Sequence, residues 1–271
     1  MIAEERKKNH SIGFVPTMGA LHAGHLSLVK KAKEENDICI VSIFVNPLQF
    51  NNKEDFNKYP IQSDQDIHLL KQAGCNIIFM PEITDFYPSE PGISVNVGLL
   101  DSILEGAHRP GHFSGVAIVI CKLFNIIQPD KAYFGQKDLQ QVAVINQLVR
   151  ELSFQVEIIS CPIIREKSGL AMSSRNMRLT DKGRELAANI YKALCLMAEK
   201  IITGEPDAKT IQQVGMQFLA TIPQIKVEYL EIVNGETLEN VSSITQRSKI
   251  GICIAAFVED VRLIDNLVII S

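Results

Sequence analysis

The segment Ile38–Val45 ("ICIVSIFV") has a single polar residue, Ser42, among its eight positions. A nearly continuous apolar run of this length, rich in β-branched residues, is typical of a strand that other elements cover on both faces. Strands of this kind occur in parallel sheets, because the connections between parallel strands place helices on both faces. The run therefore favours an α/β fold.

The neighbouring sequence alternates between strand and helix patterns. Shorter apolar runs predict strands at 12–15, 77–80, 131–134 and 155–159. Helical periodicity predicts helices at 22–36, 63–73, 112–127 and 139–151. This alternation predicts a doubly wound parallel sheet.

The pattern changes after about residue 164. Two amphipathic helical patterns, at 181–202 and 208–220, precede strand patterns at 227–233, 250–257 and 263–269. Helices followed by strands are typical of a smaller α+β domain. We therefore predict two domains, 1–163 and 164–271, joined at the polar segment 165–169.

Composition excludes several classes of partner. A net charge of −4 disfavours nucleic acid. The longest apolar stretch, 116–127, contains Lys122 and is too short to span a membrane. The first eight residues lack the apolar core of a signal peptide, and the six cysteines form no CxxC pair. We expect a cytoplasmic chain with reduced thiols and no disulfide framework.

Polar residues follow several of the predicted strands. Ligands of doubly wound sheets bind beyond the carboxyl ends of the strands. The segments at these positions contain Met18, His22 and His25, then 46–50, 135–141 and 172–176. We expect these groups to converge on a ligand.

His22 and His25 lie in the turn from the first strand to the first helix. Capping or packing of the helix is one explanation, and a zinc site that adds His108 and His112 is another. Neither pair has the accompanying cysteine or carboxylate of most catalytic zinc sites. Phosphate is favoured, because imidazole N–H groups and helix N-terminal amides both donate to oxyanions. Small residues around the pair let a ligand approach the backbone: Gly19, Ala20, Ala23 and Gly24.

Other strand-end residues allow a structural or a nucleotide-binding interpretation. Lys137 and Asp138 suit a surface ion pair, or a phosphate and a ribose. The segment 172–175 ("MSSR") suits a helix cap or a triphosphate site on a mobile loop. The sequence lacks GxxxxGK[ST], GxGxxG after the first strand, and GxSxG, which argues against P-loop enzymes, dinucleotide dehydrogenases and common hydrolases.

Five motifs occur together in a known order and spacing: "PTMGALHAGH", "FVNPLQF", "RPGHFSGV", "YFGQKDLQQ" and "MSSRN". On these motifs the chain resembles the pantothenate synthetase family, from about Gly13 to the end. The HxGH element alone would indicate only the wider nucleotidyltransferase superfamily. Compared with the family pattern, the segment before Gly13 is short, and "YPIQSDQD" lacks an arginine after Tyr59-Pro60.

The resemblance implies a Rossmann-like ATP- and pantoate-binding domain, a C-terminal α+β lid domain and a homodimer. It implies that ATP and pantoate react to pantoyl adenylate and pyrophosphate, with Mg²⁺, and that β-alanine then gives pantothenate and AMP. The first step, in which the pantoate carboxylate attacks ATP, would need no general base, because a carboxylate of pKa ~4 is already ionised.

The resemblance also implies roles for particular residues. His22, His25, Lys137 and Arg175 would be catalytic. ATP would contact Met18, Gly19, Ala20, Leu21, His22, Ala23, Gly24, His25, Gly135, Gln136, Lys137, Asp138, backbone at Ile164, Met172, Ser173, Ser174 and Arg175. Pantoate and β-alanine would contact Gln49, Gln141, Asn46 and Arg109, and Asp64 and Asp66 would assist Mg²⁺.

Three rival functions are weaker. A nucleotidyltransferase would leave its nucleotide on the product instead of releasing AMP. An inactive nucleotide-binding regulator would be expected to lack His25, Lys137 or Arg175, and all three are present. A zinc-binding structural protein is the remaining alternative.

Overall fold

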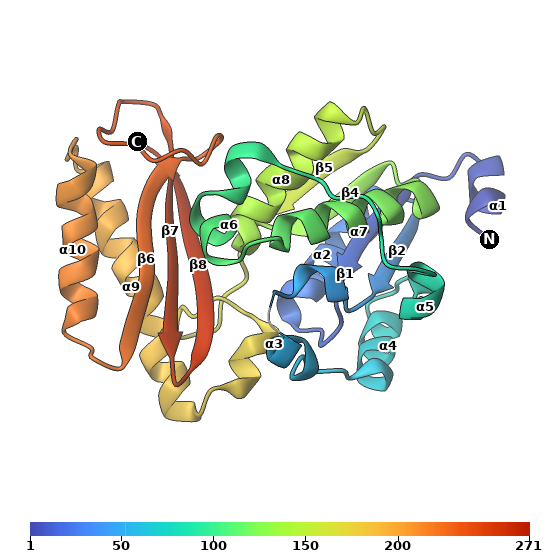
Figure 1. Ribbon diagram of the computed structural model, residues 1–271, viewed down its shortest axis with the longest axis horizontal. Helices are drawn as coiled ribbons and strands as arrows, with labels where there is room; N and C mark the ends of the chain where they lie inside the picture. The colour runs from blue at the N-terminus through green and yellow to red at the C-terminus, as the bar shows by residue number, and fades with distance from the viewer. Residues whose placement is uncertain (52) are drawn as a thin grey trace. The chain divides into compact units, whose positions relative to one another are not determined.

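The computed structural model of the protein describes residues 1–51 and 53–271. They form two compact units, one of residues 1–136 and 144–162, the other of residues 137–143 and 163–271. Figure 1 shows the helices and strands of both. No helix in these ranges is long and apolar enough to cross a lipid bilayer.

The first unit is built on a five-stranded parallel sheet in the order β3-β2-β1-β4-β5. Its strands are β1 (Ile12–Thr17), β2 (Ile38–Ile43), β3 (Ile77–Phe79), β4 (Lys131–Gly135) and β5 (Glu157–Cys161). The chain proceeds outward from β1 to β3 and then returns to β4 on the other side of β1. This reversal creates the switch point at which doubly wound sheets bind ligands. The prediction of an α/β fold is confirmed.

Helices cover both faces of this sheet. On one face, α2 (Ala23–Glu35) and α4 (Ser63–Gln72) contribute to a core that also contains Val15 and Val41. On the other, α7 (His112–Ile127) brings Phe124 edge-on to Phe14, with ring centroids 6.5 Å apart. Phe14 and Val15 reach opposite faces because successive strand side chains alternate. These strands are apolar on both faces because helices pack against both faces of the sheet.

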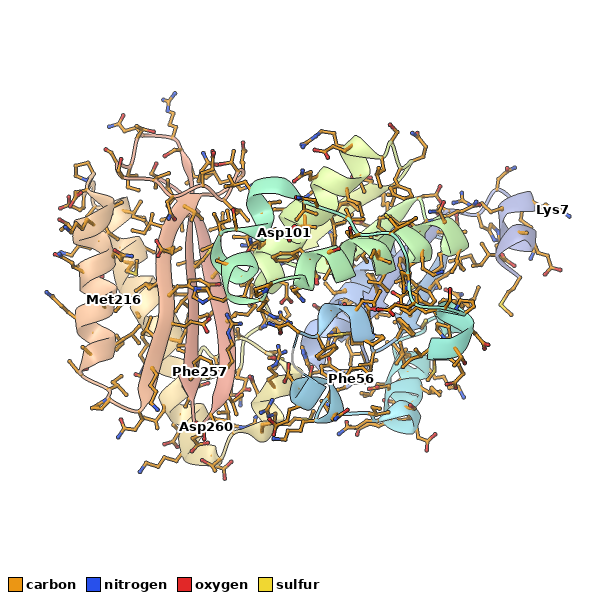
Figure 2. The ribbon with its side chains drawn as sticks, viewed as in Figure 1. Lys7, Phe56, Asp101, Met216, Phe257 and Asp260 are labelled. Atoms are coloured by element: carbon orange, nitrogen blue, oxygen red, sulfur yellow. The ribbon has the colours of Figure 1, made fainter. Side chains whose placement is uncertain are left out.

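The second unit contains the antiparallel sheet β6-β7-β8, formed by Ile225–Asn234, Lys249–Val258 and Val261–Ile270. The helices α9 (Asp181–Ile202) and α10 (Ala208–Ala220) pack against each other and against the sheet (Figure 1). Both Glu259 and Asp260 have positive φ, 51° and 63°. This left-handed pair forms the two-residue turn between β7 and β8, where Figure 2 labels Asp260. The predicted C-terminal α+β arrangement is confirmed.

The predicted helices 112–127, 139–151, 181–202 and 208–220 agree with α7, α8 (Leu139–Glu151), α9 and α10. Strand β5 begins and ends two residues later than the predicted strand 155–159. Short elements were not predicted, since they carry too few residues for a periodic pattern. They are α1 (Ile2–Lys7), α3 (Lys53–Asn57), α5 (Ile83–Phe86), α6 (Leu104–His108), η1 (Pro47–Gln49), η2 (Gly98–Asp101), η3 (Gln136–Asp138) and η4 (Ser174–Arg178).

Helix α7 and the short helix η1 approach each other at Gly115. A Cβ atom on Gly115 would overlap the backbone of Leu48, and it would lie 2.8 Å from the backbone nitrogen of Gln49. Backbone atoms cannot rotate away as a side-chain end can, so glycine is required for this contact. The requirement fixes the position of the residues that follow β2.

We predict that Gly115→Ala lowers the free energy of unfolding by about 1–3 kcal/mol, because overpacking outweighs the helix propensity gained. Gly92→Ala is the matched control, since no atom lies within 4 Å of its added Cβ. Urea denaturation of both variants measures the difference. Equal midpoints for the two variants would contradict this explanation of Gly115.

Candidate functional site

The loop from β1 to α2 has an unusual backbone. Gly19 and Ala20 both adopt left-handed conformations, with φ values of 77° and 49°. Thr17 supports the loop at its start: its Oγ1 accepts from the Gly19 N–H at 3.2 Å and donates to the Ser42 carbonyl at 2.7 Å. The loop is therefore tied to the neighbouring strand β2 before it reaches the helix.

Asp66, in the first turn of α4, holds the same loop further along. Its Oδ2 accepts from the Ala20 N–H and its Oδ1 from the Leu21 N–H, both at 2.8 Å. The residue is 1% exposed. A Cβ on Gly19 would lie 2.8 Å from Asp66 Oδ2, so the glycine makes room for the carboxylate. Two charge-assisted hydrogen bonds thus determine the path of the loop.

His22 and His25 begin the helix that follows. His22 is the N-cap of α2, and its Nδ1 accepts from the Gly24 N–H at 3.1 Å. The Nδ1 of His25 accepts from the His22 N–H at 3.4 Å, which completes a reciprocal capping box. The ring centroids are 4.1 Å apart. The capping interpretation of the pair is therefore correct for the Nδ1 atoms.

These hydrogen bonds also determine the tautomers. Because Nδ1 of each ring is an acceptor, a neutral ring carries its hydrogen on Nε2. Each Nε2 is then a donor, at the amino end of a 13-residue helix whose dipole favours an anion. Capping and anion binding are compatible, since they use different nitrogens.

Asn46 organises the residues after β2. It is 1% exposed, caps η1 by accepting from the Leu48 N–H at 3.3 Å, and donates from Nδ2 to the Gly115 carbonyl at 3.0 Å. Its Nδ2 also lies 3.2 Å from Gln49 Oε1, and Gln49 Nε2 lies 2.8 Å from Met18 Sδ. Met18, Asn46 and Gln49, which come from two strand ends, are thus brought together.

Tyr87 also contacts this group, although the sequence analysis did not select it. Its hydroxyl donates to Asn46 Oδ1 at 3.0 Å. Burial raises the pKa of Tyr87, so the hydroxyl stays protonated and remains a donor. Tyr87 was not found from the sequence, because the residues that follow the predicted strand 77–80 form no recognisable motif.

His112 and Arg109 meet the backbone of Gln49. His112 Nδ1 donates to the Gln49 carbonyl at 2.8 Å, and Arg109 Nη2 donates to the same oxygen at 3.4 Å. Arg109 Nη1 also donates to His112 Nε2 at 3.1 Å, and it lies 3.8 Å from a carboxylate oxygen of Glu105. Both ring nitrogens of His112 are engaged in this network. The zinc alternative therefore does not fit, and within 1–51 and 53–271 no three His, Cys, Asp or Glu side chains are placed to hold a metal ion.

In the second unit, Lys137 lies in η3, directly before α8. Its side chain is 16% exposed, and its Nζ lies 4.0 Å from Asp138 Oδ1. The Lys137 carbonyl accepts a hydrogen bond from Asn266 Nδ2 at 2.9 Å. The predicted ion pair with Asp138 is long, so it leaves the ammonium group weakly held. Gln141 is half-buried in the first turn of α8.

Residues 172–175 follow a bend at 166–169. The Met172 N–H donates to the Ile164 carbonyl at 2.9 Å, and Ser173 caps η4 by accepting from the Arg175 N–H at 3.2 Å. The buried Asn176 donates to Glu166 and to the Ala171 carbonyl, both at 3.0 Å. The predicted cap is therefore present, and Ser174 and Arg175 lie in the first turn of the short helix that it caps.

The two carboxylates predicted to assist Mg²⁺ differ in their surroundings. Asp64 is exposed on α4, whereas both oxygens of the buried Asp66 accept backbone hydrogen bonds. A carboxylate in this position supports the β1–α2 loop. The role of Asp64 and Asp66 toward Mg²⁺ stays a prediction, and the contacts of Asp66 add a support of the loop to it.

The remaining predicted nucleotide contacts lie at the ends of strands or at the starts of helices. Gly135 ends β4, Gln136 begins η3, Ala23 and Gly24 begin α2, and Leu21 is buried beside them.

Known proteins with similar sequences and structures point to one family. The sequence matches the Pantoate-beta-alanine ligase family over residues 1–268. A pantothenate synthetase of Cytophaga hutchinsonii is 63% identical over 269 residues, which are 99% of this chain and 95% of the relative. This agreement extends over both compact units.

Solved structures agree. The pantothenate synthetase of Thermus thermophilus matches with a TM-score of 0.91 at 42% identity, over 98% of this chain and 97% of that chain. A pantoate–β-alanine ligase of Francisella tularensis, complexed with beta-gamma ATP and β-alanine, matches with a TM-score of 0.79 at 38% identity, over 98% and 93% of the two chains. The resemblance predicted from the five motifs is confirmed. The chain therefore belongs to the pantoate–β-alanine ligase family, and it is an enzyme that forms pantothenate from pantoate and β-alanine.

Proposed function

We propose that the enzyme joins its two substrates through a pantoyl adenylate. A pantoate carboxylate oxygen attacks the α-phosphorus of ATP, and the bond to pyrophosphate breaks. The neutral amine of β-alanine then attacks the acyl carbon, AMP leaves with the electron pair of the broken bond, and the amine loses a proton. The complex of the Francisella tularensis ligase with beta-gamma ATP and β-alanine supports ATP as the reacting nucleotide.

The observation that carries this proposal is the pair of Nε2 donors at the amino end of α2. Bringing a carboxylate to a polyanionic nucleotide is opposed mainly by charge repulsion, so donors that bind phosphate oxygens lower the barrier. We assign this task to His22 and His25, whose Nδ1 atoms are already engaged by the helix cap. The loop 18–21 and residues 23–24 complete this side of the nucleotide site.

In the second unit we assign phosphate binding to Lys137, Ser173, Ser174 and Arg175. Lys137 and Arg175 supply positive charge, and the serine hydroxyls supply further donors. Gly135, Gln136, Asp138 and the backbone at Ile164 complete the nucleotide contacts. Mg²⁺ would enter bound to the phosphates and neutralise part of their charge.

Gln49 and Gln141 suit pantoate, because amide groups bond hydroxyls and a carboxylate without adding net charge. Asn46 orients the Gln49 side chain, and Arg109 with His112 holds its carbonyl. We propose that this group binds pantoate and then β-alanine.

We further propose that the second domain predicted from the sequence, 164–271, acts as a lid, that two copies of the chain form a dimer, and that the enzyme works in the cytoplasm. A lid would protect the adenylate from hydrolysis. Sedimentation of the purified protein measures the dimer directly, and a monomer at all concentrations would contradict it.

The decisive experiment mixes the enzyme with ATP, Mg²⁺ and pantoate and follows pyrophosphate before and after β-alanine is added. We expect a burst near one equivalent per site, then turnover with free AMP once the amine is present. A nucleotide left attached to the product would favour the nucleotidyltransferase alternative. No pyrophosphate under any condition would exclude adenylation.

We predict that His25→Ala reduces the rate of adenylation roughly a hundred-fold to a thousand-fold, because a preorganised donor to the phosphates is lost. Single-turnover pyrophosphate release measures it. The fold should persist, since the cap provided by His22 remains. His68→Ala, an exposed histidine on α4, is the matched control. A loss of activity matched by an equal loss of folded protein would contradict the assignment.

We predict that Gln141→Ala raises the KM for pantoate by about ten-fold and the KM for ATP by much less, since a hydrogen bond to pantoate is removed. Steady-state kinetics with each substrate varied measures both values. Gln147→Ala, on the same helix, is the control. Equal changes in the two KM values would show that the role of Gln141 is wrong.

We predict that Asp66→Asn weakens ATP binding and slows adenylation, because an amide accepts from only one of the two loop N–H groups. The defect should persist when Mg²⁺ is raised well above its saturating concentration. Asp85→Asn, an exposed charge on α5, is the control. Recovery of activity at high Mg²⁺ would instead identify Asp66 as a metal ligand.

A further inference from the structure

Strand β8 departs from a regular pattern of burial at two consecutive residues. From Val261 to Ile264 buried and half-buried residues alternate, as expected for a strand with one covered face, but Asp265 and Asn266 are both buried, at 5% and 2% exposed. Consecutive side chains of a strand point to opposite faces of the sheet. Both faces of β8 are therefore covered at this point, which requires a further segment on the second face. Two polar side chains are thus buried back to back.

Asp265 lies on the face that carries α9. Arg165 forms a bidentate pair with it, with Nη1–Oδ2 at 2.6 Å and Nη2–Oδ1 at 3.0 Å. The guanidinium lies 3.7 Å above the ring of Tyr191 of α9. Burial raises the pKa of the Asp265 carboxyl, and the hydrogen bonds from Arg165 act in the opposite direction. Arg165 therefore compensates part of the cost of burying this carboxyl group.

Arg165 connects this pair to the segment that carries Ser173–Arg175. Its Nη1 also donates to the Gly169 carbonyl at 3.1 Å, and Arg165 forms an isolated antiparallel bridge with Ala171. Ala171 directly precedes Met172 and the capped helix η4. Through Arg165, Asp265 thus supports the bend at 166–169 and the residues that lead from it to η4.

Asn266 lies on the opposite face, where it holds Lys137. Its Nδ2 donates to the Lys137 carbonyl at 2.9 Å. Two residues later, Leu139 Cδ2 lies 3.7 Å from the position that a Cβ on Gly251 of β7 would occupy. The negative charge of Asp265 also attracts the Lys137 ammonium. The segment 137–143 is therefore packed on this face of the sheet, as its membership of the second unit indicates.

We propose that Asp265 and Asn266 are positioning residues that set the spacing between Lys137 and the Ser173–Arg175 segment, by holding one on each face of β8. The inference rests on the proposed function in taking these two segments as ligands of the ATP phosphates. Charged groups act on a transition state only when their positions are set before the reaction. A strand in a hydrogen-bonded sheet is a rigid support of this kind.

Asn266→Ala tests the inference, because it removes the hydrogen bond to the Lys137 carbonyl and leaves the buried Arg165–Asp265 pair intact. We expect the KM for ATP, and the Kd of a non-hydrolysable ATP analogue, to rise about ten-fold, while the KM for pantoate changes less than two-fold. Asn266→Leu, which keeps a similar size but loses the donor, should behave in the same way. Thermal unfolding verifies that both variants are folded.

A double-mutant cycle with Lys137→Ala separates positioning from a structural role. If Asn266 acts through Lys137, Asn266→Ala adds nothing to the loss of kcat/KM for ATP in the Lys137→Ala background. Additive losses, or equal changes in the KM values for ATP and pantoate, would overturn the inference. If Lys137→Ala alone leaves kcat/KM for ATP unchanged, the proposed role of Lys137 is wrong, and the inference falls with it.

Arg262→Gln provides the matched control on the same strand. It removes a half-buried ion pair in which Arg262 Nε lies 3.0 Å from Glu228 Oε2. We expect this variant to lose some thermal stability and to keep the wild-type KM for ATP. An increase in KM similar to that of Asn266→Ala would show that any weakening of β8 has this effect, and would overturn the specific role of Asn266.

Discussion

The position of β1 between β2 and β4 is the constraint on which the first unit depends. Because all five strands are parallel, their carboxyl ends lie at one edge, and the chain must leave β1 there between two neighbours. The backbone amides of the departing loop need acceptors, since buried N–H groups without partners are costly. Asp66 meets this need for Ala20 and Leu21, and so determines where α2 and its two histidines begin.

Several polar side chains of the first unit act mainly on backbone or on one another. Asn46 caps η1 and binds the Gly115 carbonyl, while His112 and Arg109 share the carbonyl of Gln49. Buried polar groups of this kind are stable only when their hydrogen bonds are made. The side chain of Gln49, which we propose as a pantoate ligand, is therefore ordered by its neighbours Asn46 and Met18, and such order would reduce the entropy lost on binding.

The second unit uses a different support. Its antiparallel sheet packs α9 and α10 on one face, so the other face is available for a separate segment. The segment 137–143 occupies part of that face through contacts with Asn266 of β8 and Gly251 of β7. The residues that follow β4 thereby belong to the second unit. The two compact units are therefore not separated by a single point in the sequence.

The sequence by itself determined the α/β class, the order of the long elements and the family, because apolar periodicity and five motifs are local patterns that survive without tertiary contacts. It also selected the strand-end residues, including both histidines. Only the tertiary structure decided what Asp66, Tyr87, His112 and Asn266 do. Each acts through a partner more than 20 residues away, on a backbone atom or a polar side chain that no local pattern identifies. Such contacts exist only after the chain has folded, so their chemistry could not be predicted from the composition of either segment alone.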